Sequence, residues 1–363
     1  MFQLTFLGTS AGLPTKYRNV TGLAVECVNN FLSGDKKKSK SQRPWILIDC
    51  GEGTQHQLLH TKLSLHRLEV ICITHVHGDH CYGLAGLLAS MAMAGRKSEL
   101  TLIAPQAISK LLDTLSITTE LYFPFPVRFI ALETLIEQQN AQLTIAFSQH
   151  HQLTIDVIAL SHRAPSHAFA LTQNISTRKL DIEKLYQLGI EAGESWGKLQ
   201  RGESIMGNDG QLIEADSVCQ QQKHSTKIIV AGDNDTPELL SKACDSATLL
   251  VHEATYTQAV LERIQHKQQT GQMAIDPMHS SVQSVAQFAQ SVELPNLILT
   301  HFSARYQPYE DIESDTANMA HIRAEATAYY HGNLWLAEDF ATYSVDENGV
   351  KLISSPEAVT HKS

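Results

Sequence analysis

The chain has 363 residues, of which 43% are hydrophobic and 18% are charged, and this composition excludes an intrinsically disordered protein. Its formal net charge of -10 argues against a general affinity for nucleic acid, because proteins of that kind usually carry a basic footprint. A local basic groove is still compatible with this total.

Short apolar runs bounded by turn residues predict many β-strands. In chain order they cover residues 1–8, 21–28, 45–50, 68–74, 100–104, 153–160, 227–231, 248–253 and 296–300. Apolar residues at helical spacing follow Asp79, with Gly95 as the expected stop, and recur after His279, where a serine suits the N-cap. Strands and helices mixed along the whole chain predict a layered α/β domain.

Two segments interrupt this pattern. Residues 29–44 are polar and basic, and we expect an exposed loop between two strands there. The run KKKSK at residues 36–40 fits a solvated loop, with phosphate contact as the alternative. Residues 173–203 contain one helical stretch and little else to bury, so they are expected to project as a substrate-binding arm. We expect a single domain over residues 1–345 and a C-terminal tail over residues 346–363.

The cysteines predict a reducing compartment. All six are scattered, without a C-x-x-C pair, which is typical of reduced, mostly buried thiols in a cytosolic protein. The first residues, MFQLTFLGTS, lack the features of a signal peptide, and no apolar run reaches transmembrane length. We therefore expect a cytoplasmic protein without a membrane-spanning segment.

The stretch ITHVHGDH carries the strongest chemical signal. His75, His77, Asp79 and His80 follow an apolar strand, and imidazole and carboxylate groups are the ligands that suit Zn²⁺ and related divalent ions. These four residues cannot complete two metal shells, so further ligands are expected at other strand ends. His162, Asp233 and His301 each follow an apolar strand. A nearby histidine, His167, competes with His162 for this role.

This pattern resembles the metallo-β-lactamase superfamily, whose motif is H-x-H-x-D-H followed by a distal His, Asp and His. The resemblance implies an αβ/βα sandwich with two metal ions at one edge of the paired sheets. It assigns His75, His77 and His162 to the first metal, and Asp79, His80 and His301 to the second. Asp233 would bridge the two ions, which we expect to be zinc, with manganese as the alternative.

Two metal ions that share a carboxylate can lower the pKa of a shared water and neutralise a phosphate oxygen, which suits ester or phosphodiester hydrolysis. Asp79 is the candidate that orients or deprotonates the nucleophile. Glu253 and His279 are the candidates for the proton donor, because a glutamate bonded to a histidine favours the imidazolium. The alternative is that His279 caps a helix and Glu253 is structural.

The segment PTKYRN, residues 14–19, follows a glycine-containing loop and offers Lys16, Arg18 and Asn19 for contact with phosphate. It resembles the P-x-K-x-R-N loop of the ribonuclease Z family, the endonucleases that remove the 3′ trailer from precursor tRNA. DCGEGTQHQLL, THVHGDHCYGLAGLL, HEAT and LTHFSARY resemble that family's signatures in the same order. The resemblance implies that the loop lies near the tRNA 3′ end, that Arg305 contacts phosphate, and that the protein is a homodimer.

The sequence departs from that family at several points. It reads GDN and HSS where the family has GDT and HST, Ala85 replaces a proline, and the arm lacks a Gly-Pro step. One alternative is therefore a phosphodiesterase or esterase of the same superfamily that acts on a small substrate. A second alternative is a binding or regulatory protein that keeps the fold without turnover.

Overall fold

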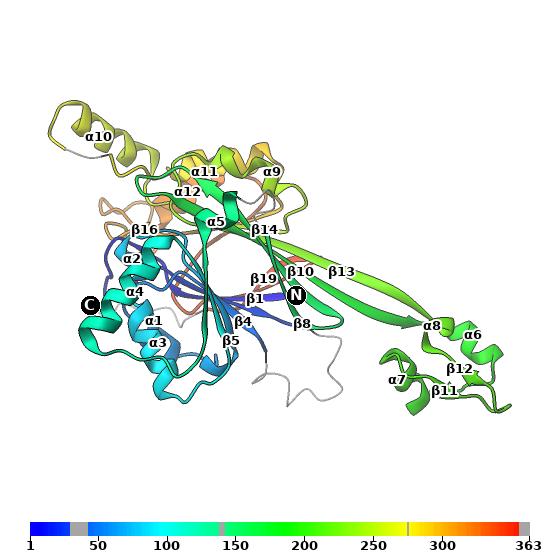
Figure 1. Ribbon diagram of the computed structural model, residues 1–363. Coiled ribbons are helices and arrows are strands. Elements are labelled where there is room, and N and C mark those ends of the chain that lie inside the picture. The colour runs from blue at the N-terminus through cyan, green and yellow to red at the C-terminus, as the bar shows by residue number, and fades with distance from the viewer. Residues whose placement is uncertain (30–42, 138–141, 274–275, 356–363) are drawn as a thin grey trace.

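The computed structural model describes residues 1–29, 43–137, 142–273 and 276–355, and shows two β-sheets packed face to face with helices outside them (Figure 1). The expected basic loop therefore lies almost wholly outside the described residues, as does its run at residues 36–40. Among the described residues, every helix is too short or too polar to span a bilayer.

The first sheet has eight strands. Their spatial order is β19 (Gly349–Ser354), β18 (Thr342–Asp346), β1 (Phe2–Gly8), β3 (Gly22–Cys27), β4 (Trp45–Ile48), β5 (Leu68–Cys72), β6 (Leu100–Ala104) and β7 (Val127–Ala131). Strands β4 to β7 pair in parallel, and the others pair antiparallel. We expected the domain to end at residue 345, but β19 pairs with β18 and continues the sheet to Ser354.

The second sheet has seven strands. Their order is β17 (Asn333–Leu336), β15 (Asn296–Thr300), β14 (Leu249–Glu253), β13 (Cys219–Ala231), β10 (Ser166–Leu180), β9 (His151–Leu160) and β8 (Gln142–Ser148). A short parallel pair, β2 (Ser10–Ala11) with β16 (Phe302–Ser303), ties the N-terminal loop to the segment that follows His301.

Three apolar clusters hold the layers together. The central cluster lies between the sheets and includes Phe6 and Ile48 from the first sheet and Phe169 and Ile298 from the second. The outer cluster of the first sheet is covered by α1 (Thr54–Leu59), α3 (Leu84–Met93) and α4 (Gln106–Thr119). The outer cluster of the second sheet is covered by α9 (Ser241–Cys244), α11 (Val282–Ser291) and α12 (Met319–Tyr329). The layers form the αβ/βα sandwich that the resemblance implied.

A long hairpin leaves the second sheet and carries a small globule at its tip (Figure 1). Strands β10 and β13 pair in continuous register from Ala168–Ala231 to Leu180–Cys219. The globule contains α6 (Ile182–Gln187), α7 (Glu194–Gln200), β11 (Ile205–Met206), β12 (Leu212–Ile213) and α8 (Ala215–Val218), and it has an apolar cluster of its own. We expected an arm over residues 173–203; the projection also takes in the globule's second half and the start of β13.

Candidate metal centre

Four strands deliver the candidate ligands to one edge of the sandwich. His75 and His77 follow β5 in the first sheet. In the second sheet, His162 follows β9, Asp233 follows β13, and His301 follows β15. Strand β10 is antiparallel to both β9 and β13, so those two strands run in the same direction and end at the same edge. Strands β13, β14 and β15 are parallel, which brings His301 to that edge as well.

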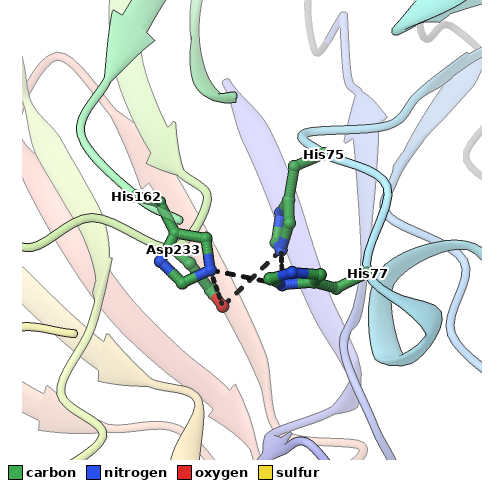
Figure 2. A group of neighbouring side chains, drawn as sticks. All are labelled: His75, His77, His162 and Asp233. Atoms are coloured by element: carbon green, nitrogen blue, oxygen red, sulfur yellow. Dashed lines mark hydrogen bonds and ion pairs between the residues drawn. The ribbon is translucent and has the colours of Figure 1, made fainter. Parts of the chain in front are cut away.

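The first ligand group consists of His75, His77, His162 and Asp233, and Figure 2 shows these side chains turned toward one another. His77 Nδ1 lies 3.0 Å from His75 Nε2 and 3.2 Å from His162 Nε2. Asp233 Oδ2 lies 3.6 Å from His75 Nε2 and 3.7 Å from His162 Nε2. Four ligand atoms therefore surround one small space.

The second ligand group consists of Asp79, His80 and His301. His80 Nε2 lies 3.2 Å from His301 Nε2, and Asp79 Oδ2 lies 3.3 Å from that same His301 nitrogen. The other oxygen of Asp233, Oδ1, lies 3.3 Å from both His80 Nε2 and His301 Nε2. Asp233 thus presents one oxygen to each group, as a bridging carboxylate does.

The spacing and chemistry of these donors fit divalent metal ions. A tetrahedral shell with Zn–N distances of 2.0–2.1 Å places its ligand atoms about 3.3 Å apart, close to the separations in both groups. Neutral imidazole and carboxylate are the ligand types that such ions take. The structure brings the seven expected residues into the two expected groups, and His167 is not among them, because its Nδ1 bonds Thr74 O instead.

Buried partners orient the ligating rings. His162 Nδ1 donates to Met278 O at 2.8 Å, and His80 Nδ1 donates to Asp49 Oδ2 at 2.7 Å. Thr255 Oγ1 lies 3.0 Å from His301 Nδ1. These contacts place the ring protons on Nδ1 and leave each Nε2 lone pair for a metal. Asp49 follows β4, the parallel neighbour of β5. The expected strand over residues 45–50 contained Asp49, so its place at a strand end became visible only in the structure.

Burial and charge set the protonation of the ligands. Burial, and then the ring of His80, lowers the pKa of His75 well below its usual value. Burial opposes ionisation of Asp79, but the hydrogen bond with His301 and the charge of His80 hold the pKa of this carboxyl low. Burial also lowers the pKa of His80, but the carboxylates of Asp233 and Asp49 raise it well above its usual value. The centre therefore has an electrostatic preference for positive charge.

Glu253, at the end of β14, and His279, before α11, form a second layer of the site. His279 Nδ1 lies 3.0 Å from both oxygens of the buried Glu253 carboxylate. Burial lowers the pKa of His279, but Glu253 and then Asp233 raise it to about 9. His279 can also be grouped with Asp233 and His301 as a metal ligand, but its Nδ1 is engaged by Glu253.

The departures from the family motif keep this second layer in place. Asn234 is buried, its backbone N–H donates to Glu253 Oε1 at 2.8 Å, and its side-chain amide lies 3.1 Å from His252 Nε2. Ser280 Oγ donates to Asn234 O at 2.6 Å. Asn234, which replaces the threonine of GDT, therefore bonds both Glu253 and Ser280. Ser281, which replaces the threonine of HST, caps α11 by accepting from Ser284 N at 3.1 Å.

The predicted RNA contacts differ in exposure. Lys16 and Arg305 are exposed, and the Arg305 guanidinium lies over the ring of Tyr256, 5.1 Å from its centroid. Asn19 is half-buried and its side chain donates to Glu52 O at 3.0 Å. Arg18 is buried, donates to Tyr306 O at 2.8 Å and lies over Phe302. In this structure Arg18 anchors the loop rather than facing solvent.

A cavity of about 380 Å³ opens beside the ligands. It is lined by ligand side chains and also by Gly12, Arg163, Met273 and Pro277, which the sequence analysis did not single out. Gly12 N donates to Asp79 Oδ2 at 2.7 Å, and Arg163 Nη2 lies 3.3 Å from His77 Nε2. The position of Arg163 directly after a ligand was the one signal available in the sequence.

Solved structures share this fold. The short form of human tRNase Z superposes with a TM-score of 0.56 at 22% identity, covering 94% of this chain and 98% of that one. The Bacillus subtilis metallo-β-lactamase-fold protein YhfI gives 0.56 at 14% identity over 94% and 98% of the two chains. The chain therefore has a metallo-β-lactamase sandwich with two groups of histidine and aspartate side chains at one edge.

Closer relatives identify the family. The chain is 43% identical to ribonuclease Z of Marinobacter nauticus, over 95% of this chain and 97% of that protein, and 42% identical to ribonuclease Z of Pseudomonas putida, over 95% and 98%. The family model described as anti-Pycsar protein Apyc1 matches residues 2–182. The identity and coverage of these relatives place the chain in the ribonuclease Z family.

Proposed function

We propose that this protein hydrolyses the phosphodiester at the 3′ end of precursor tRNA, giving a tRNA with a 3′-hydroxyl and a trailer with a 5′-phosphate. The observation that carries the proposal is the pair of ligand groups sharing Asp233, in a chain so similar to ribonuclease Z over nearly its whole length. Paired metal sites of this kind suit phosphodiester hydrolysis.

We propose that both ions are zinc, because histidine nitrogen dominates the donor set, with manganese as the alternative. The first would be held by His75, His77 and His162, the second by Asp79, His80 and His301, with Asp233 between them. When bound, such a pair lowers the pKa of a water molecule and neutralises charge on phosphate oxygens.

Asp79 is proposed to orient the attacking water. Its Oδ2 accepts the Gly12 N–H and lies beside His301, so the carboxylate is fixed from two sides. The low pKa of this carboxyl keeps it ionised, so it can accept a hydrogen bond from the water and hold it in position. The N-terminal loop thus donates a hydrogen bond to Asp79, the residue proposed to orient the water.

His279 is proposed to protonate the oxygen that leaves. Both Glu253 oxygens face Nδ1, which holds a proton there and leaves Nε2 for the substrate. A His279→Ala enzyme should keep two metal ions and lose about a hundredfold or more in kcat, because general acid catalysis contributes on this scale. Near-normal turnover with full metal content would show that His279 only supports the fold.

The proposed substrate contacts are Lys16, Asn19 and Arg305, with Arg18 holding their loop in place. Lys16 and Arg305 are exposed cations on segments that the β2–β16 pair fixes together, so both can reach the same nucleic-acid chain. We also propose that the arm binds the body of the tRNA and that the protein works as a homodimer in the cytoplasm. Its six free cysteines support a reducing compartment.

The decisive experiment compares a 3′-extended precursor tRNA with bis(4-nitrophenyl) phosphate, a generic phosphodiester. Endonucleolytic cleavage of the precursor, with a 5′-phosphate on the released trailer, is the expected result. Hydrolysis of the generic substrate alone would contradict the proposal.

One observation favours a second function, hydrolysis of a small phosphodiester. The globule at the tip of the arm, residues 181–218, has eight acidic and three basic residues, a net charge of -5. Such a surface repels a phosphate backbone instead of attracting it. The comparison of substrates above separates the two functions.

A further inference from the structure

Arg163 is the feature of the pocket that the proposed mechanism leaves without a role. It directly follows His162 in the turn after β9, and its side chain is exposed on the wall of the cavity. Its Nη2 lies 3.3 Å from His77 Nε2. Within the described parts of the chain, no carboxylate lies within ion-pair distance of its guanidinium. The arginine therefore faces the pocket without an anionic partner.

The hydrogen bond between Arg163 and His77 cannot form when the first ligand group holds a metal. His77 points Nδ1 toward His75 and His162, so this nitrogen provides the lone pair for coordination. The proton of the neutral ring then sits on Nε2. Both Nε2–H and the guanidinium are donors, so they cannot bond each other.

Two adjacent donors that face an open cavity are placed to share one acceptor of the substrate. A phosphate group offers several oxygens and a negative charge, and an arginine beside a second N–H matches it better than it matches a neutral carbonyl. The other two arginines near the site differ from Arg163: Arg18 is buried against Tyr306 O, and Arg305 lies over Tyr256.

We propose that Arg163 and the Nε2–H of His77 together bind a backbone phosphate of the substrate, the one adjacent to the scissile phosphate on the trailer side. The His77 ring separates this donor pair from the ligating nitrogen, which puts the bound phosphate one position away from the bond that is cleaved. The trailer side is assigned because the N-terminal loop, expected near the tRNA 3′ end, contacts the second ligand group, so Arg163 at the first group lies on the other side of the cleaved bond. Gly12 contacts Asp79 of the second ligand group, whereas Arg163 contacts His77 of the first.

This assignment rests on the proposed function, because it requires a nucleotide chain that continues past the cleaved bond. It makes Arg163 a binding residue for the trailer and gives it no part in the proton transfers. Removing it should weaken substrate binding and raise KM, with kcat little changed.

The test is a double-mutant cycle on the metal-loaded protein. Arg163→Gln is paired with a non-cleavable precursor tRNA whose first trailer phosphate is replaced by an uncharged methylphosphonate. Arg128→Gln is the matched control, since Arg128 is an exposed arginine on the edge strand β7, outside the pocket. Binding affinity and metal content are measured for each protein.

We expect Arg163→Gln to bind the normal precursor about tenfold more weakly, the scale of one charged hydrogen bond, and to retain both ions. The methylphosphonate should weaken binding by wild type by the same factor. It should not weaken binding by Arg163→Gln any further. The slope of log binding constant against log salt concentration should become shallower by about one, the value for one phosphate contact. Arg163→Lys, which keeps the charge, should recover part of the affinity, and Arg128→Gln should behave as wild type.

If the losses of affinity from Arg163→Gln and from the methylphosphonate simply add, the proposal is wrong. Loss of a metal ion from Arg163→Gln would also overturn it. A wild-type protein that binds the precursor as tightly as Arg163→Gln does would contradict this inference alone. A wild-type protein that binds no precursor would contradict the proposed function and, with it, this inference.

Discussion

Second-layer residues decide how the ligand side chains present their nitrogens. Asp49 accepts from the Thr74 N–H at 2.7 Å, from the Thr74 hydroxyl at 2.8 Å and from His80 Nδ1 at 2.7 Å. Its backbone lies in the left-handed region, at φ 58, as does that of His301, at φ 57. Non-glycine residues adopt this conformation at a cost, and such residues gather at functional sites. The contacts around Asp49 and His301 therefore hold both residues in a costly backbone conformation.

A buried histidine far from the metal centre gives the protein a pH-dependent stability. His151, at the start of β9, is buried and its Nε2 accepts from Gln173 Nε2 at 2.7 Å. Burial, and then the positive N-terminus, lowers the pKa of His151 from 6.5 to about 4. Between these two values the unfolded chain binds a proton that the folded chain does not, so stability falls as the pH falls.

We expect wild type to lose about 2 kcal/mol more free energy of unfolding than His151→Gln between pH 7 and pH 4.5. Glutamine keeps an acceptor for Gln173 and cannot titrate. Urea denaturation of both proteins in chelator, where metal release adds nothing, measures the difference. Parallel pH curves for the two proteins would contradict the assignment.

At the scale of elements, close backbone packing places the H-x-H-x-D-H segment. A Cβ at Gly51 would lie 2.3 Å from Asp79 O, and a Cβ at Gly83 would lie 2.1 Å from Gly51 O. Only glycine allows the turn after β4 to touch α2 (Gly78–Cys81), the short helix that contains Asp79 and His80.

Gly51→Ala should therefore displace α2 and shift Asp79 and His80 relative to the other ligands. We expect about 2 kcal/mol lower stability, the usual scale of overpacking, and fewer than two metal ions per chain. Thermal unfolding and metal analysis measure the two effects. Gly193→Ala in the arm is the matched control, because no atom lies within 4 Å of its added Cβ. Full metal content in Gly51→Ala would show that the turn can yield.

The globule at the tip of the arm can be deleted without changing the sandwich. Leu180 and Cys219 face each other in register where the globule joins the hairpin, and the globule's apolar cluster is its own. Replacing residues 181–218 by a two-residue Gly-containing turn should leave hydrolysis of bis(4-nitrophenyl) phosphate within about twofold of wild type. KM for precursor tRNA should rise at least about tenfold, in line with the loss of several contacts.

Steady-state kinetics on both substrates measure this prediction. Unchanged kinetics on precursor tRNA would show that the globule does not bind substrate. The acidic tip makes the result informative, since binding there cannot rest on charge attraction alone.

At the scale of the whole molecule, the metal centre joins the two sheets. The first ligand group takes His75 and His77 from one sheet and His162 and Asp233 from the other. Ions that bind only the folded chain stabilise it by mass action, by about 4 kcal/mol when free ion is a thousand times the dissociation constant.

Chelation should therefore lower the free energy of unfolding by about that amount, and zinc should restore it. Guanidinium denaturation with and without chelator measures the change. Magnesium, which prefers oxygen ligands, is the control ion and should restore little. Equal stability of the metal-loaded and metal-free proteins would contradict the link between the sheets.

Prediction from the sequence succeeded for strands that are continuous apolar runs and failed for several others. Strands β6 and β15 match the expected residue ranges because both are continuous apolar runs. The far half of β13 was missed, and so was the whole of β10, although β10 is buried where it begins. The far halves of these two strands project from the sheet and are stabilised by pairing with each other. Strand β19 was missed for a similar reason: half or more of its residues are exposed.

The sequence by itself determined the candidate ligands, because imidazoles and carboxylates gathered at the ends of apolar strands favour a metal site. It also determined the layered α/β class, because strands and helices alternate along the whole chain. Only the tertiary structure decided which oxygen of Asp233 faces which group, that Asp49 fixes His80, and that Arg18 is buried while Arg163 faces the cavity. These are relations between segments distant in the chain. Their distances depend on how the two sheets pack, which no local pattern of residues specifies.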